Sequence, residues 1–337
     1  MRKEDLRIVF MGTPEFAVES LKALVENNYN VVAVITQPDK PVGRHQEQLQ
    51  APPVKQYALA HNLPVLQPEK MKNPEFHAAL AAYKADLQVV VAFRMLPKVV
   101  WDMPRFGTFN VHAALLPQYR GAAPINWAII NGETKTGVTT FFLDKDIDTG
   151  KIILQHEFPI PDDADVEYVY DGLMCLGADL AMKTIDLICE TIPDSDIDFK
   201  TVLDKISIEQ NEAEATTQAP KIFKETCEIN WNQPAKKVYD FVRGLSPYPG
   251  TWTKMQLIDT TAAQPKQPMI MKVFRTRKTE IKATRVPGSL VVEKSHLYVN
   301  TADFMLELLD VQISGKKRME VKAFLNGFQA ISSYQLG

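Results

Sequence analysis

Short apolar runs alternate with stretches of helical spacing through the N-terminal part of the chain, and this alternation limits the possible folds more than any other feature. The runs at 6–11, 31–36 and 86–93 are rich in Val, Ile and Phe, as buried strands are. The stretches at 14–28 and 51–62 repeat apolar residues with the period of a helix. Alternating strands and helices predict an α/β fold with a Rossmann-like, mostly parallel sheet and helices on both faces. In such a sheet, ligands bind beyond the carboxyl ends of the strands.

A polar segment at 204–220 separates this part from a region of short β-rich stretches. The segment ends in Pro and has the composition of a linker. The β-rich stretches between 269 and 313 have the spacing of a small, OB-like β-barrel. A length of 337 residues agrees with two domains. We therefore expect a catalytic domain at 1–203, a linker at 204–220 and a C-terminal β-barrel domain at 221–337.

The net charge of −3 is distributed unevenly along the chain. From Lys221 to the C-terminus, 18 Lys and Arg stand against 10 Asp and Glu, a net charge of +8. The preceding 220 residues hold 20 against 31, a net charge of −11. Such asymmetry indicates that the basic part binds a polyanion, or that two surfaces of opposite sign dock on each other. Charge alone leaves both interpretations open.

The overall composition is that of an ordinary globular protein, with 45% hydrophobic and 23% charged residues. The longest apolar run, at 87–93, is far too short to span a bilayer. Charges interrupt the first residues, MRKEDLRIVF, so they do not resemble a secretory signal. Cys175, Cys189 and Cys227 form neither a C-x-x-C motif nor an even framework. We expect a cytoplasmic protein without disulfides, a structural metal or a membrane partner.

Polar side chains end one of the predicted strands, in the stretch FNVHAALLPQYRGAAP. Asn110 and His112 are two positions apart and therefore point to the same face of that strand. The downstream stretch TTFFLDKDIDTG carries three carboxylates, Asp144, Asp146 and Asp148. Such a set suits attack on a carbonyl, because His moves a proton, a carboxylate orients it and Asn stabilises an oxyanion. No Ser or Cys nucleophile is evident in this region, which assigns the attacking group to the substrate.

A histidine in a strand is also commonly a structural, hydrogen-bonded residue, and the residues alone leave the two interpretations balanced. The turn GTPEF after the first strand lacks the G-x-G-x-x-G pattern of dinucleotide sites. From the residues alone, the chain is expected to be an α/β enzyme that acts on a carbonyl.

The whole region FNVHAALLPQYRGAAPINWAIINGETKTGVTTFFLDKDIDTG resembles the active-site region of 10-formyltetrahydrofolate-dependent formyltransferases. The stretches MGTPEFAVESL, ITQPDKPVGR, PPVKQYAL and VVVAFRMLP extend the resemblance through the N-terminal part. The stretches INWNQPAKKVYDFVRGLSPYPGTW and LDVQISGKKRM are similar to those of family members that act on charged initiator tRNA. The resemblance therefore covers nearly the whole chain.

This resemblance implies transfer of the formyl group of 10-formyltetrahydrofolate, the co-substrate, to the amino group of methionine on initiator tRNA, a step of translation initiation. It implies Asn110, His112 and Asp148 as the catalytic residues. It places the folate against two loops, whose residues are Phe93, Arg94, Met95, Leu96, Ala114, Leu115, Leu116 and Pro117. The implied tRNA contacts are Lys40, Arg44, Arg275, Arg277, Lys316 and Lys317. We expect a monomer that binds no metal.

Two positions depart from the family pattern. Ala114 stands where the family usually has Ser, and the loop VGRHQEQLQ lacks the usual run of Gly, Arg and Lys, so that only Lys40 and Arg44 are basic there. Three other functions remain open: a sugar-nucleotide N-formyltransferase, a hydrolase of 10-formyltetrahydrofolate, and a catalytically silent RNA-binding protein. The C-terminal stretches favour tRNA over the sugar, and the intact catalytic residues argue against a silent protein.

Overall fold

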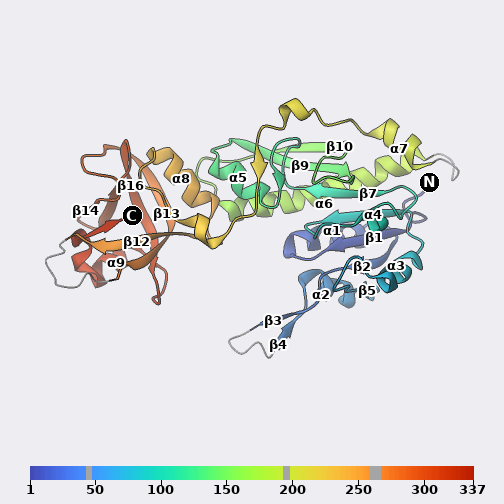
Figure 1. The fold of residues 1–337 in the computed structure, drawn as a ribbon, viewed down its shortest axis with the longest axis horizontal. Coiled ribbons are helices and arrows are strands. Elements are labelled where there is room, and N and C mark those ends of the chain that lie inside the picture. Colours follow the sequence, from blue (N-terminus) through green and yellow to red (C-terminus); the bar gives the residue numbers. More distant parts are fainter. Residues whose placement is uncertain (43–47, 193–197, 259–266) are drawn as a thin grey trace. The chain divides into compact units, whose positions relative to one another are not determined.

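The computed structural model of the chain describes residues 1–42, 48–192, 198–258 and 267–337 (Figure 1). Arg44, one of the expected tRNA contacts, lies outside these residues. The chain forms two compact units, which interleave along the sequence. The first comprises residues 1–121, 136–159 and 170–218, and the second comprises residues 122–135, 160–169 and 219–337. The expected domain limits at 203 and 220 stay a prediction.

A seven-stranded sheet in the order β10-β9-β7-β6-β1-β2-β5 forms the centre of the first unit. Its strands are β1 (Ile8–Gly12), β2 (Val31–Ile35), β5 (Val65–Leu66), β6 (Leu87–Val91), β7 (Thr108–His112), β9 (Lys135–Phe142) and β10 (Ile152–Pro159). The five strands from β7 to β5 are parallel, and β9 runs antiparallel to β7. This sheet confirms the Rossmann-like, mostly parallel fold expected from the sequence.

Helices cover both faces of this sheet. The helices that follow these strands along the chain are α1 (Glu15–Glu26), α2 (Pro53–Ala60), α3 (Pro74–Ala81), α4 (Lys98–Trp101), α6 (Val166–Thr191) and α7 (Phe199–Ile206). Val9 and Met11 of β1 pack in one core with residues of α3 and α4. On the opposite face, α6 approaches β7 so closely at Gly177 that a Cβ there would lie 3.2 Å from Val111. No helix in the described ranges is both long and apolar enough to cross a membrane.

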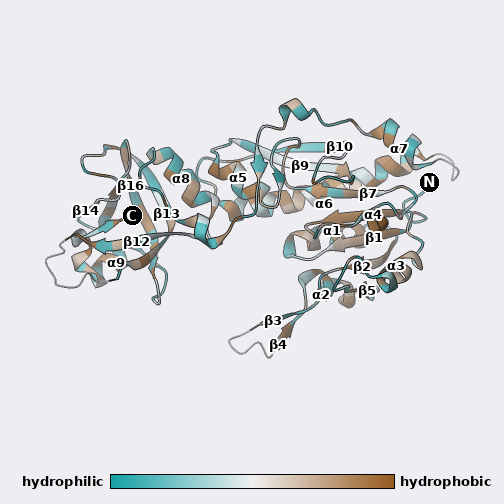
Figure 2. Ribbon diagram, in the orientation of Figure 1, coloured by the Kyte–Doolittle hydropathy of each residue, from teal (hydrophilic) through white to brown (hydrophobic). Residues whose placement is uncertain are grey.

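Burial on both faces explains why β1 is apolar along its whole length and why β6 is apolar except at Gln88 (Figure 2). Every residue of β1 and β6 is buried. Strands between two helical layers have no polar face, so their sequences are continuous apolar runs without alternation. The polar side chains of β7 therefore stand out in such a sheet.

An antiparallel sheet in the order β14-β15-β16-β13-β12-β18 forms the centre of the second unit. Its strands are β12 (Thr251–Leu257), β13 (Met269–Lys282), β14 (Leu290–Glu293), β15 (His296–Asn300), β16 (Phe304–Ile313), β17 (Met319–Glu320, paired with β16) and β18 (Tyr334–Leu336). The helices α5 (Pro124–Ile130), α8 (Ala235–Gly244) and α9 (Val321–Gly327) belong to the same unit. Short strands elsewhere are β3 (Lys40–Val42), β4 (Gln48–Gln50), β8 (Arg120–Gly121) and β11 (Gln218–Ala219).

The two edges of the second sheet meet, which confirms the small β-barrel expected from the sequence. Ser289 and Gln335 form an isolated antiparallel bridge, and the Leu336 N–H donates to the Gly288 carbonyl at 2.9 Å. Gly288 has a φ of +86°, and a Cβ at this position would lie 1.9 Å from the Leu336 carbonyl oxygen. Only glycine fits this closure point. Any other residue would have a disfavoured φ, and its Cβ would collide with the backbone of Leu336.

We expect Gly288→Ala to lower the free energy of unfolding by more than Gly315→Ala does. Gly315 has a similar φ of +79°, and a Cβ added there would have no atom of the described residues within 4 Å, so its variant measures backbone strain alone, about 1–3 kcal/mol. Denaturant unfolding of both variants separates strain from the steric conflict with Leu336. Equal losses would show that the closure does not depend on a bare backbone at Gly288.

Candidate active site

His112 ends β7 and is almost completely buried, with 6% of its surface exposed. Its Nε2 atom lies 2.9 Å from the carbonyl oxygen of Tyr119. A carbonyl oxygen can only accept a hydrogen bond, so Nε2 carries the proton that it donates. The nitrogen that gains or loses a proton is therefore Nδ1, which lies 3.8 Å from Oδ2 of Asp148. The geometry suits a carboxylate that stabilises the protonated imidazole.

Asp148 lies on the loop between β9 and β10 and is held from two sides. Its Oδ2 atom accepts a hydrogen bond from the Gly121 N–H at 2.9 Å. Its φ of +56° lies in the left-handed region, which non-glycine residues rarely adopt. At Gly150 a Cβ would lie 1.7 Å from the Phe142 carbonyl oxygen, so the loop passes directly against the end of β9. These contacts turn the carboxylate of Asp148 toward His112.

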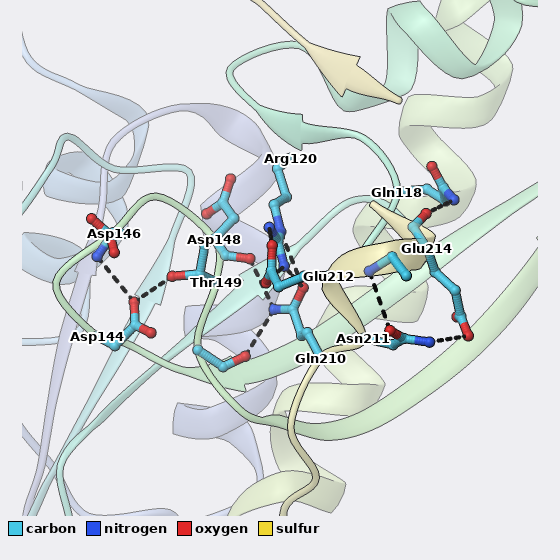
Figure 3. A network of polar contacts seen from close by, with 12 residues as sticks. Gln118, Arg120, Asp144, Asp146, Asp148, Thr149, Gln210, Asn211, Glu212 and Glu214 are labelled. Carbon is cyan, nitrogen blue, oxygen red and sulfur yellow. Dashed lines mark hydrogen bonds and ion pairs between the residues drawn. The ribbon is translucent and has the colours of Figure 1, made fainter. Parts of the chain in front are cut away.

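The carboxylate of Asp144 holds the turn of this loop, to which Asp146 contributes its backbone N–H (Figure 3). Oδ1 of Asp144 accepts hydrogen bonds from the Asp146 N–H at 3.1 Å and from the Thr149 hydroxyl at 2.7 Å. Both side chains are exposed. Among the three carboxylates, only that of Asp148 lies within 4 Å of the His112 ring.

Asn110 lies two positions before His112 on β7 and is half-buried. Its Oδ1 atom is buried and has no hydrogen-bond partner among the described residues. Buried polar atoms are almost always hydrogen-bonded, so such an atom requires an explanation. A donor supplied by a bound substrate is one that fits a site at the carboxyl end of the sheet.

The two expected folate loops follow β6 and β7, which are adjacent and parallel, so both lie at the same edge of the sheet. The Thr139 hydroxyl fixes the second loop, because it donates to the Ala114 carbonyl at 2.6 Å and accepts from the Leu116 N–H at 3.1 Å. Gln155 donates to the Leu116 carbonyl at 2.7 Å. Leu115 is half-buried against Gly137, where a Cβ would lie 2.5 Å from its side chain.

The first of these loops is fixed by Arg94. Its guanidinium donates to the carbonyls of Glu69, at 2.9 Å, and Pro68, and burial lowers its pKa. Leu96 is buried in the core, whereas Met95 is 71% exposed. The structure thus brings the three expected catalytic residues and both loops together within the first unit. Their catalytic and folate-binding roles stay predictions.

The expected tRNA contacts are spread over both units. Lys40 is exposed on β3, which pairs with β4. Arg275 lies 3.9 Å from Glu320, and Arg277 binds the buried carboxylate of Glu307 at 2.8 Å. The two other members of the set, Lys316 and Lys317, lie exposed in the turn between β16 and β17 and have no ion-pair partner among the described residues. Arg277 therefore has a structural partner that its sequence context did not indicate.

Sequence reasoning missed a polar network behind Asp148 (Figure 3). Arg120 is buried and donates through Nε and Nη2 to Oε1 of Gln210, at 3.1 and 2.7 Å. The same guanidinium binds the carboxylate of Glu212, which raises the pKa of Arg120 and lowers that of Glu212. Gln210 lies in the segment expected to be a linker, and nothing local in its sequence indicates contact with a catalytic loop.

Comparison with known proteins matches both parts of the chain to one family. The family model described as formyl transferase matches residues 6–185, more than half of the chain. The chain belongs to the formyl transferase family. The model described as formyl transferase, C-terminal domain, matches residues 221–329 of this formyl transferase.

Relatives named methionyl-tRNA formyltransferase align with this formyl transferase over its full length. The protein from Parabacteroides distasonis is 55% identical over 340 residues, covering 100% of both chains. The protein from Bacteroides thetaiotaomicron is 52% identical over 339 residues, again covering 100% of both. A solved N-formyltransferase from Helicobacter canadensis, in complex with folinic acid and dTDP-3-aminofucose, superimposes with a TM-score of 0.61 at 18% identity, covering 93% of this chain and 100% of its own. This last likeness shows a shared fold alone.

Proposed function

We propose that this formyl transferase moves the formyl group of 10-formyltetrahydrofolate to the amino group of methionine on initiator tRNA. The observation that carries the proposal is the full-length identity of 55% with a protein named methionyl-tRNA formyltransferase. The basic C-terminal part agrees with it, because phosphate neutralisation supplies much of the affinity for RNA. We place the reaction in the cytoplasm, where charged tRNA is used, and expect a monomer.

The chemistry follows from the three polar side chains. The neutral amine of methionine attacks the formyl carbon, and a new C–N bond forms while the carbonyl oxygen becomes an oxyanion. The amide nitrogen of Asn110 donates to that oxyanion, and its unpartnered Oδ1 accepts from the attacking N–H. Nδ1 of His112 takes the proton that the amine loses.

The second half of the reaction breaks the bond between the formyl carbon and N10 of the folate. The proton on His112 passes to N10, so the leaving amine departs neutral and the imidazole returns to its starting state. The carboxylate of Asp148, 3.8 Å from Nδ1, stabilises the imidazolium between the two transfers. The residues of the two loops after β6 and β7 hold the folate.

A competition assay tests the proposal. Purified chain is given labelled 10-formyltetrahydrofolate together with charged initiator tRNA and a nucleotide-linked amino sugar, in water. We expect the label on methionyl-tRNA. Label predominantly on the sugar would favour a sugar N-formyltransferase, and predominant release of formate would favour the hydrolase; either result would overturn the proposal.

Reversal of charge at Lys316 and Lys317 tests the tRNA-binding surface. We expect the double variant Lys316→Glu/Lys317→Glu to bind tRNA more weakly and to flatten the dependence of log K on log salt by about 1.5, since each phosphate contact contributes about 0.7–0.9. Arg277 suits this test less well, because a carboxylate in its place would face the buried Glu307 and alter stability.

The double variant Lys70→Glu/Lys72→Glu is the matched control, because both lysines are exposed in the first unit. Salt titrations of tRNA binding and a melting curve are measured for each variant. An unchanged salt slope with a lowered melting temperature would instead mean that the two lysines stabilise the protein through charged neighbours.

A further inference from the structure

Residues 204–218 of the segment expected to be a linker belong to the first unit and contact its catalytic loops. Near its start, the side-chain amide of Gln210 donates to the carbonyls of Asp148 at 2.9 Å and Gly150 at 2.8 Å. Near its end, the Thr217 carbonyl accepts from the Tyr119 N–H at 2.8 Å. Gln118 accepts from the Thr217 N–H at 3.0 Å, which fixes this end further.

These two contacts are made to the backbone of the two residues whose oxygen atoms face the nitrogens of the His112 ring, Asp148 and Tyr119. Asp148 has a φ of +56° and Tyr119 a φ of +60°. Both conformations are disfavoured for residues with a side chain and persist only where the surroundings hold them in place. The structure therefore supplies a hydrogen-bond restraint at the strained backbone of each of these two residues.

The side-chain amide of Gln210 can hold the Asp148 loop in only one of its two flipped orientations. An arginine side chain has donors and no acceptor, so the oxygen of the Gln210 amide must face Arg120. The NH₂ group then faces the two carbonyls of the loop, which only accept. Glu212 holds Arg120 from the other side, and Gln210 itself is 8% exposed. The oxygen and the NH₂ group of the buried amide thus both have hydrogen-bond partners.

We propose that Gln210 is a positioning residue for formyl transfer, which holds the backbone of the Asp148 loop so that the carboxylate stays beside Nδ1 of His112. Its identity as an amide is essential, because one group must accept from Arg120 and donate to two carbonyls. The inference rests on the proposed function for the reaction that is measured, while the hydrogen-bond restraint itself is independent of the substrate.

Two variants of the full-length chain separate positioning from packing. Gln210→Met keeps the size and removes every hydrogen bond. Gln210→Glu keeps the acceptor and gains a charge pair with Arg120, but its carboxylate has no donor for the Asp148 and Gly150 carbonyls. If Gln210 positions the loop, both variants lower kcat by about 10- to 100-fold while the KM for each substrate stays within about two-fold. The melting temperature of the Glu variant falls less than that of the Met variant, because the Glu variant keeps its hydrogen bonds to Arg120.

Gln335→Met is the control, because Gln335, which is half-buried, likewise donates to a backbone carbonyl, that of Pro287 at 3.3 Å. It keeps the wild-type kcat. A role in packing alone predicts that both variants keep the wild-type kcat, because both keep the size of the side chain. A role through Arg120 alone predicts that Gln210→Glu keeps full kcat and only Gln210→Met is impaired, because only Met loses the acceptor for Arg120. Either result would overturn the proposal, as would a rise in KM at unchanged kcat.

Hydrogen exchange without substrate gives a second readout, which does not depend on the reaction. The Gly121 N–H is bonded to the Asp148 carboxylate, so release of the loop exposes it to exchange. We expect the Gly121 N–H to exchange faster than in the wild type in both Gln210 variants. In Gln335→Met we expect its exchange rate to be unchanged. Unchanged exchange at Gly121 overturns the positioning role. Failure of the wild type to formylate methionyl-tRNA, combined with faster exchange in the Gln210 variants, overturns the proposed function and leaves the restraint supported.

Discussion

Replacing His112 with alanine, or Asp148 with asparagine, lowers kcat for formyl transfer by about 100- to 10,000-fold while the protein stays folded. Loss of the imidazole removes the group that carries the proton from the amine to N10. Loss of the negative charge at Asp148 leaves the imidazolium without its stabilising neighbour 3.8 Å away. Asparagine suits this test, because it tolerates the left-handed φ of +56° and keeps an oxygen for the Gly121 N–H.

Asp146→Asn is the matched control, because Asp146 lies on the same loop with its side chain exposed. It makes the same chemical change without contact to His112 and is expected to keep the wild-type rate. Single-turnover rates with saturating substrates, together with circular dichroism and melting curves, complete the test. A folded His112→Ala or Asp148→Asn protein with near wild-type turnover would show that the assignment of these roles is wrong.

The sequence predicts the fold class well because its main determinant is local. Strands buried on both faces are predominantly apolar, so β1 is visible in the sequence as IVFMG and β6 as LQVVV, in which only Gln88 is polar. The pairing of Asn110 with His112 follows equally directly from the two-residue period of a strand. The antiparallel direction of β9 against β7 has no such local signal, because a reversal depends on how the chain returns to the sheet.

The remaining parts of the site depend on contacts between distant residues. Spacing alone does not tell Asp144, Asp146 and Asp148 apart, since the backbone turn at Asp148 decides which carboxylate faces His112. Gln210 contacts Asp148, 62 positions earlier, from a polar segment whose composition indicates a linker. Arg277 is paired with Glu307 through the register of β13 against β16, which the charge pattern of one strand does not contain.

Asn110→Ala lowers kcat by about 100- to 1,000-fold and leaves the KM of both substrates nearly unchanged. The reason lies in when the hydrogen bond becomes strong. The ground-state formyl oxygen carries little charge, whereas the oxygen of the tetrahedral intermediate is an anion in a largely buried site, so the amide nitrogen of Asn110 stabilises the transition state more than the bound substrate. Only such differential binding raises the rate of the chemical step.

The isosteric variant Asn110→Asp sharpens this prediction. It preserves the size of the side chain at a half-buried position and exchanges the donating NH₂ for a carboxylate oxygen. A negative charge beside the developing oxyanion is repulsive, so we expect Asn110→Asp to be slower than Asn110→Ala at neutral pH. Steady-state kinetics with each substrate varied in turn decides the matter. If Asn110 instead binds the ground state, removal of its amide raises KM at unchanged kcat, and the oxyanion would then have to be stabilised by a backbone N–H of the loops after β6 and β7.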